Sequence, residues 1–235
     1  MIKEAIQYLL SLGTVEQHAV NGQTYSDKQL HLLPEPTPGT LIVRNLSGVV
    51  DYLQSNYDNQ PPVLIQIASP TKVHVYSTFN NDMKRKQLIQ AEALLPDIPF
   101  EKFMDTEHFN VLLQSCFVTN DFRADLLAVV GSITESNVTT VGDDGVSQQV
   151  TGKSGVAILG NIPVPNPVLL KPYRTFVEIP QPESSFIFRM RTGPSCALFE
   201  ADGGAWKLDA IEGIKKYLSG ILSKEIEDGF VTIIA

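Results

Sequence analysis

The order in which helix-like and strand-like patterns follow one another constrains this fold more than any single motif does. Both patterns mix over residues 39–82, helical patterns cluster over 83–136, and strand patterns dominate 138–201 before a last helix and a last strand. Regular alternation of strands and helices would favour a doubly wound sheet, whereas this segregation favours α+β. We therefore predict an α+β fold with a mixed N-terminal part, a helical middle and an antiparallel, β-rich C-terminal part that ends in a helix and a strand.

The same order suggests how the chain is divided. Residues 2–12 read as an amphipathic helix, and residues 14–39 are polar and end in a stretch rich in proline and glycine. We predict an N-terminal helix with an irregular arm over 1–38, an α/β subdomain over 39–136 and a β-rich subdomain with a C-terminal helix over 137–235. One compact domain containing the last two segments is the alternative.

Local patterns in the α/β segment predict its elements. A strand is expected at 40–44, followed by a helix with Ser47 at its N-cap. The apolar run 63–68 and the strand-like run 72–78 flank a turn and indicate a hairpin. Good helix formers over 83–95, ending before Pro96, predict a helix.

The remaining elements follow from similar signals. Phe100 to Phe117 predicts a helix, and Asn120 or Asp121 is expected to cap the next one. A glycine- and aspartate-rich turn within 138–150 indicates a hairpin. Asp209 with Glu212 resembles a capping box at the start of the last helix, and Phe230–Ile234 is an apolar final strand.

Charge and cysteine content exclude several classes of function. Residues 1–150 hold 9 Lys+Arg and 17 Asp+Glu, whereas residues 151–235 hold 9 of each. A general duplex-DNA binder is normally basic, so any anion-binding surface here must be local and must lie in the second part. Two cysteines cannot form a four-thiolate zinc site, and the four histidines have no metal-ligand spacing. We predict no metal site and no cofactor.

No catalytic constellation is readable. Gly152-Lys153-Ser154 lacks the glycine that a phosphate-binding loop needs five residues earlier, because that position is Ser147. His108 lies one helical turn from Asp105, a spacing that is commonly structural. We therefore assign no catalytic residue.

The best candidate for a binding site is a local reversal of charge in the C-terminal third. Lys171, Tyr173 and Arg174 fall in one strand-like run, and Arg189 with Arg191 alternates with apolar residues in the next. If the two runs pair, their cations converge on a patch suited to phosphate or carboxylate. Trp206, the single tryptophan, follows a tight turn and is expected to stack on a base or ring.

The alternative is structural. Arginines on a solvated sheet face often form ion pairs, and three carboxylates lie within reach in sequence: Glu178, Glu183 and Glu200. Guanidinium groups that are scattered, or already neutralised by these neighbours, would remove the predicted site.

Three segments of the chain resemble the YfdQ-like proteins, a family encoded by phages and prophages. They are Gly39–Val43 with Leu46–Leu53, Phe100–Phe103 with Ala124–Ser132, and a hairpin-rich region that ends in two strands joined by a turn and then a helix. The resemblance covers about residues 39–225. It brings no activity and no site residue, but it implies an accessory protein made in the cytoplasm of an infected or lysogenic bacterium.

These observations lead to a ranked expectation of function. We expect a non-enzymatic phage accessory protein in the host cytoplasm, acting as a counter-defence factor that captures a host protein or a small anionic or nucleotide ligand. The alternative is an accessory to phage recombination or replication that binds single-stranded nucleic acid or a partner enzyme, and an enzyme is third. No membrane association is expected. Self-association stays open, because Phe230–Ile234 or Phe186–Met190 at a sheet edge would pair with another copy.

Overall fold

The computed structural model describes residues 2–13, 15–20, 23–26, 38–81, 83–132, 138–143, 148–154, 157–164, 166–191 and 195–235. The chain divides into two units, Met1–Thr37 and Pro38–Ala235. None of the described helices combines the length and the apolar character needed to cross a membrane.

The first unit contains a helix and a small hairpin. Helix α1 (Ile2–Gly13) is confirmed, and its apolar side chains Ile2 and Leu10 are exposed by 80% and 68%. The arm was predicted to be irregular, which is wrong for part of it, since β1 (Gln17–Val20) pairs antiparallel with β2 (Gln23–Ser26). The strands are short and polar, so periodicity did not reveal them.

A mixed five-stranded sheet in the order β14-β4-β5-β6-β3 opens the second unit. Its strands are β3 (Leu41–Val43), β4 (Val63–Ser69), β5 (Lys72–Phe79), β6 (Arg85–Glu92) and β14 (Val231–Ile234). The inner strands pair antiparallel, whereas β14 pairs in parallel with β4 and β3 in parallel with β6. The predicted hairpin and final strand are confirmed. The last strand of the chain thus completes a sheet that begins at Leu41, across the boundary expected at 136/137.

The helix predicted over 83–95 is wrong, because these residues contain β6. This strand pairs with β5 on one side and β3 on the other. Ile89 and Ala91 are buried, while Gln90 and Glu92 on the opposite face are only partly buried. The free energy of burial between two strands outweighs the helix propensity of lysine, glutamine and alanine.

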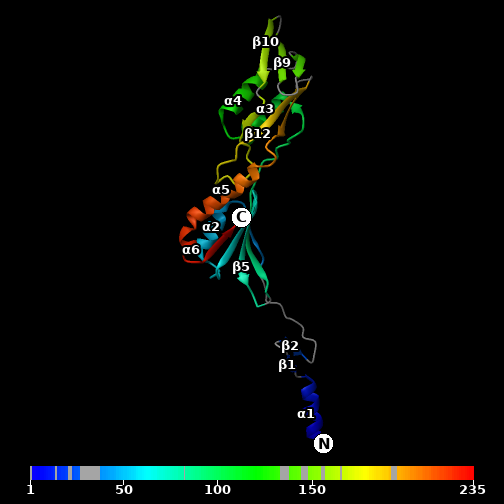
Figure 1. The fold of residues 1–235 in the computed structure, drawn as a ribbon, viewed down its shortest axis with the longest axis vertical. Coiled ribbons are helices and arrows are strands. Elements are labelled where there is room, and N and C mark those ends of the chain that lie inside the picture. The colour runs from blue at the N-terminus through cyan, green and yellow to red at the C-terminus, as the bar shows by residue number, and fades with distance from the viewer. Residues whose placement is uncertain are drawn as a thin grey trace. The chain divides into compact units, whose positions relative to one another are not determined.

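Three helices lie on one face of this sheet (Figure 1): α2 (Leu46–Ser55), α5 (Trp206–Ile221) and α6 (Ser223–Glu227). Alternate strand residues pack with the apolar stripes of α2 and α5 in a first core, whose members include Leu46, Val49, Leu53, Ile65, Val75, Ile89, Ile214 and Leu218.

Both helix starts differ from those predicted. Asn45, and not Ser47, caps α2, with its Oδ1 accepting from Gly48 N at 3.0 Å. Helix α5 begins at Trp206, three residues before the expected capping box at Asp209, and Ala205 at its N-cap has no side-chain hydrogen bond to the helix. Asparagine and serine are both good N-caps, so sequence alone does not choose between residues two apart.

A second core forms around a four-stranded antiparallel sheet in the order β11-β12-β13-β7. Its strands are β11 (Val168–Leu170), β12 (Ser184–Arg191), β13 (Ser195–Glu200) and β7 (Met104–Asp105). Helices α3 (Thr106–Cys116) and α4 (Asp121–Gly131) pack against it, with Phe109, Leu113, Leu126 and Val130 buried.

The ends of the predicted middle helices are only partly right. Asn120 caps α4 as expected, but α3 starts at Thr106, because Asp105 caps it and residues 104–105 pair with β13. Strands β8 (Val138–Asp143), β9 (Gln148–Ser154) and β10 (Ala157–Val164) form a separate antiparallel sheet. The predicted hairpin is thus present, although most of its turn lies outside the described residues. The predicted α+β class is confirmed.

Residues 171–183 connect the two cores. Val118 N donates to Lys171 O and Tyr173 N to Cys116 O, which attaches the beginning of the segment to the second core. Phe176 and Ile179 are buried in the first core. This segment, the connector (residues 171–183), is therefore attached to both cores.

Candidate functional site

Arg174, the centre of the predicted cationic patch, is buried and paired within the chain. Its Nη1 donates to Glu200 Oε1 at 2.7 Å and its Nη2 to Ser184 Oγ, with Asp202 Oδ2 3.9 Å away. The guanidinium lies 3.9 Å from the centre of the Trp206 ring. Burial lowers the pKa of Arg174 to about 10, against the raising effect of the two carboxylates. The group stays charged at neutral pH, and its charge is compensated internally.

Asp202 completes this cluster at the start of α5. Ser184 Oγ donates to Asp202 Oδ2 at 2.7 Å, and Gly204 N donates to Oδ1 at 3.0 Å. Burial by itself raises the pKa of Asp202, but these hydrogen bonds, another from the backbone N–H of Trp206 and the charge of Arg174 lower the pKa below its usual value. A carboxylate placed before the first turn of a helix also interacts favourably with its dipole.

Lys171 and Tyr173 do not lie in a strand, because β11 ends at Leu170. The Lys171 ammonium pairs with the Glu183 carboxylate at 3.5 Å. Tyr173 is partly buried, and its backbone N–H bonds to the second core. The prediction that these residues belong to a strand is therefore wrong.

Arg189 and Arg191 lie on β12 and alternate with buried Phe188 and Met190, as predicted. They point to the face opposite Ser184 and Arg174. Ser184 and Arg191 are the two ends of an eight-residue strand, so they lie roughly 20 Å apart. The Arg191 guanidinium lies 3.7 Å from the centre of the Phe103 ring. Of the six predicted residues, the structure brings only Arg174 and Trp206 together, and the predicted convergence is wrong.

A groove that sequence reasoning missed runs between the connector and helix α5. It has a volume of about 550 Å³, within the range typical of ligand sites. One wall is formed by Glu178, Ile179, Pro180, Gln181 and Pro182, and the other by Asp209, Gly213, Lys216, Tyr217 and Gly220. The lining is mainly apolar, with one cation and one anion on the α5 wall.

The connector wall is held in place by two polar side chains. Glu178 Oε1 accepts from Leu46 N at 2.7 Å and Ser47 N at 3.2 Å, so it compensates the free N–H groups at the start of α2. Gln181 Oε1 accepts from Arg174 N at 3.0 Å, and its Nε2 donates to Phe176 O at 3.1 Å. Because these side chains fix the backbone, the wall is preformed.

Two glycines seven residues apart shape the helix wall. A Cβ at Gly213 would lie 3.2 Å from Ile179 Cδ1, so this glycine allows the connector to approach the helix. A Cβ at Gly220 would meet no atom within 4 Å, so this glycine leaves the groove open. Their spacing of two helical turns, opposite a Pro-x-Pro segment, is the signal that the sequence offered.

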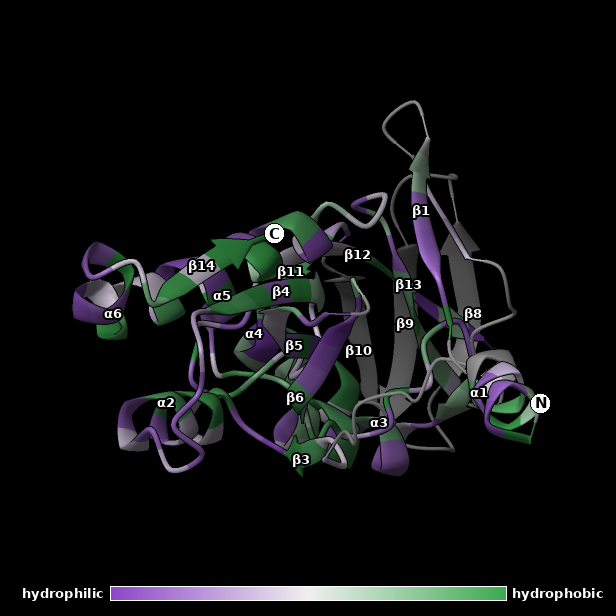
Figure 2. Cartoon of the chain, turned by 90° about the horizontal axis from the view of Figure 1, so that it is seen from below, coloured by the Kyte–Doolittle hydropathy of each residue, from purple (hydrophilic) through white to green (hydrophobic). Residues whose placement is uncertain are grey.

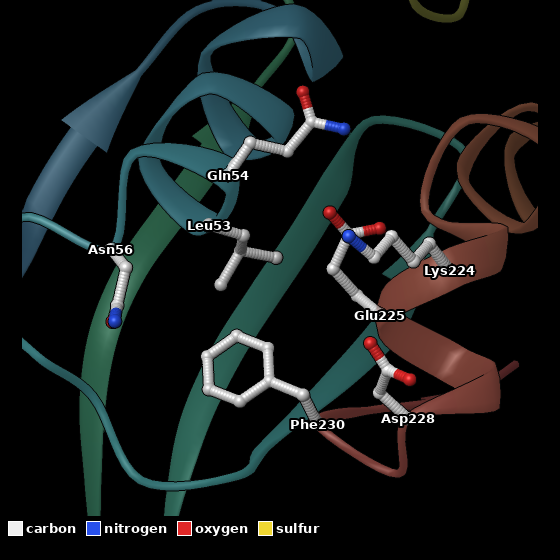
Figure 3. A pocket seen from close by; sticks show the side chains of 7 residues that line it. All are labelled: Leu53, Gln54, Asn56, Lys224, Glu225, Asp228 and Phe230. Atoms are coloured by element: carbon white, nitrogen blue, oxygen red, sulfur yellow. The ribbon is translucent and has the colours of Figure 1, made fainter.

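A smaller hollow of about 250 Å³ lies between the end of α2 and the turn from α6 to β14. Leu53 and Phe230 form its apolar part, and Lys224, Glu225 and Asp228 approach from α6 and the residues after it (Figure 3). Its volume is below that of most small-molecule sites, so the groove beside α5 is the stronger candidate.

Within the described ranges, no three side chains of His, Cys, Asp or Glu come together as a metal ion would require. The chain matches no protein-family model, no curated protein and no solved structure.

Proposed function

We propose that this protein is a capture protein whose groove beside α5 binds an extended segment of a partner protein. With the phage context that the family resemblance implies, this makes it a counter-defence factor that sequesters a host protein in the bacterial cytoplasm. The observation that carries the proposal is the preformed, mainly apolar groove between the connector and α5.

The charges at the groove favour a peptide over a small anion. Lys216 and Asp209 lie two turns apart on α5, which separates them by roughly 10 Å along the helix axis. With Glu178 on the connector wall, the groove carries two carboxylates and one ammonium, which suits a segment of mixed charge, whereas a nucleotide would need several donors around one phosphate. The apolar walls, which include Pro180, Pro182 and Tyr217, suit the aliphatic or proline side chains of such a segment.

The test fills the groove without disturbing the fold. A Cβ added at Gly220 has no atom within 4 Å, so we expect Gly220→Trp to keep the fold while its large side chain occupies the groove and abolishes partner binding. Leu208→Trp is the matched control, since Leu208 is 72% exposed on the same helix and does not line the groove. Proteins recovered from phage-infected cells with each tagged variant are compared by quantitative mass spectrometry.

A photo-crosslinking residue localises the contact. With p-benzoylphenylalanine in place of Lys216, we expect a crosslink to the same partner that Gly220→Trp loses, and no such crosslink from position 208. A partner that is recovered equally with Gly220→Trp, or that crosslinks only from position 208, would contradict the proposal.

The second candidate function, binding of single-stranded nucleic acid, is favoured by the sheet face opposite the helices. His74 and Tyr76 stack there with ring centres 5.9 Å apart, next to the amides of Gln87 and Gln90. Aromatic rings and amides are the groups that hold unpaired bases. Fluorescence anisotropy with a labelled oligothymidine tests this function, and binding that Tyr76→Ala does not weaken would exclude this face.

A further inference from the structure

Strand β14 leaves one edge of the five-stranded sheet unpaired among the described residues. Its sequence, Val231-Thr232-Ile233-Ile234, has no charge and no proline, and it contains no bulge in its pairing with β4. Natural edge strands usually carry lysine, proline or a bulge that prevents pairing with another chain. Both edge strands, β14 and β3, are coloured as apolar in Figure 2. By contrast, Phe186–Met190, the other edge strand that the sequence suggested, is internal, since β12 lies between β11 and β13.

The hydrogen-bond pattern of β14 shows which backbone groups face outward. Val63 N donates to Phe230 O at 2.8 Å, and Val231 is the register partner of Val63. In a parallel ladder with this register, Thr232 and Ile234 direct their backbone groups toward β4. The N–H and C=O groups of Val231 and Ile233 therefore point to the outer side, as an antiparallel partner would require.

We propose that β14 pairs with β14 of a second copy of this chain, antiparallel and across a two-fold axis at Thr232. Val231 of each copy then exchanges hydrogen bonds with Ile233 of the other, so the four outward groups of each strand are satisfied. The interface uses the same four residues on both sides, which is the requirement for a closed dimer. The two five-stranded sheets become one continuous sheet.

The side chains agree with this register. Thr232 is exposed and Ile234 is 44% exposed on one face, while Val231 is buried and Ile233 packs on the first core. Thr232 and its symmetry mate form a non-hydrogen-bonded pair, the closer of the two kinds of cross-strand pair. In this register Ile234 of each copy lies opposite Phe230 of the other.

The opposite edge is a poorer candidate for pairing. Strand β3 has three residues, and Arg44 follows it directly and pairs with Glu92. Pairing of β3 with β14 of another copy would be heterologous and would extend without closing. The choice between the two edges is open to a direct test.

The test uses charge at the two-fold axis. In Thr232→Lys, two like charges meet across the axis, so we expect the dissociation constant of the dimer to rise about tenfold or more. Thr232→Glu should have the same effect, and an equimolar mixture of the two variants should recover dimers, because opposite charges then face each other. Sedimentation equilibrium measures the association, and thermal unfolding confirms that each variant is folded.

Ile42→Lys is the matched control, because it adds the same charge at the exposed edge strand β3. We expect this variant to associate as the unmodified chain does. Three results would each overturn the inference: a chain that stays monomeric at the highest concentration reached, dissociation caused by Ile42→Lys but not by Thr232→Lys, or a mixture of the Lys and Glu variants that fails to recover dimers.

Discussion

The guanidinium group of Arg174 has the surroundings expected of an anion site, but both of its anions belong to the same chain. Glu200 and Asp202 neutralise it, and Trp206 stacks on it in place of a ligand ring. The residue therefore fixes the connector to β12, β13 and the start of α5. A buried cation with two internal partners has a structural role, whereas Arg189 and Arg191 keep a ligand role only as a prediction.

Removal of Arg174 should destabilise the protein strongly. Arg174→Ala removes the cation that pairs with Glu200 and lies near Asp202, at a site where the Arg174 side chain is 7% exposed, so we expect a loss of about 3–5 kcal/mol in the free energy of unfolding. Arg174→Lys should restore little, because an ammonium group lacks the planar fork that bonds Glu200 and Ser184 while its face lies on the Trp206 ring. Urea unfolding measures both. Arg189→Ala is the control. An equal loss in its free energy of unfolding would contradict the structural role assigned to Arg174.

Asp202 predicts how stability depends on pH. Its pKa is lowered in the folded protein, so its stabilising contribution is present above the unfolded-state pKa and is lost as the pH falls through the folded pKa. We expect Asp202→Asn to be less stable than the unmodified chain at pH 7. The difference should shrink below about pH 4. Urea unfolding across this range tests the effect, and a difference that is constant with pH would contradict it.

At the scale of single elements, local patterns predicted the β4–β5 hairpin, α1, α4 and the final strand, because apolar residues and turn or cap residues mark each of them in the sequence. They failed for β6, where residues with high helix propensity form a strand between two others. Alternation of Ile89, Ala91 and Ala93 with Gln90 and Glu92 was the available signal, and the run of helix formers concealed it. The spacing of Gly213 and Gly220 was the only sequence signal of the groove, and it was not enough to predict it, since the groove depends on the approach of the connector to α5.

The two groove glycines of α5 should respond differently to alanine. At Gly220 a Cβ has free space, so Gly220→Ala should stabilise the protein by about 0.5–1 kcal/mol through helix propensity. At Gly213 a Cβ would lie 3.2 Å from Ile179 Cδ1, and the buried connector must shift to receive it. We therefore expect Gly213→Ala to gain less or to lose stability. Thermal unfolding of the two variants gives the comparison, and equal gains would show that the connector does not press on the helix.

At the scale of the whole second unit, long-range pairing decides the architecture. The pairing of β14 with β4 joins residues that are more than 160 positions apart, and no local pattern specifies it. The connector is hydrogen-bonded to both cores. Thr175 Oγ1 donates to Pro70 O at 2.6 Å beside the first core, and Tyr173 N donates to Cys116 O at the second. Two cores that share such a segment should unfold together.

Phe176→Ala tests this coupling, because Phe176 lies in the connector but is buried in the first core. The cavity should cost about 3–5 kcal/mol. Cys116 and Cys196 report on the second core: both are buried, and burial, with the charge of Asp105, raises the pKa of Cys196 to about 12. We expect Phe176→Ala to lower the urea concentration at which both thiols become open to alkylation. It should lower the urea midpoint of the Trp206 fluorescence transition by the same amount. Thiol protection that persists after the fluorescence transition would mean that the two cores unfold independently.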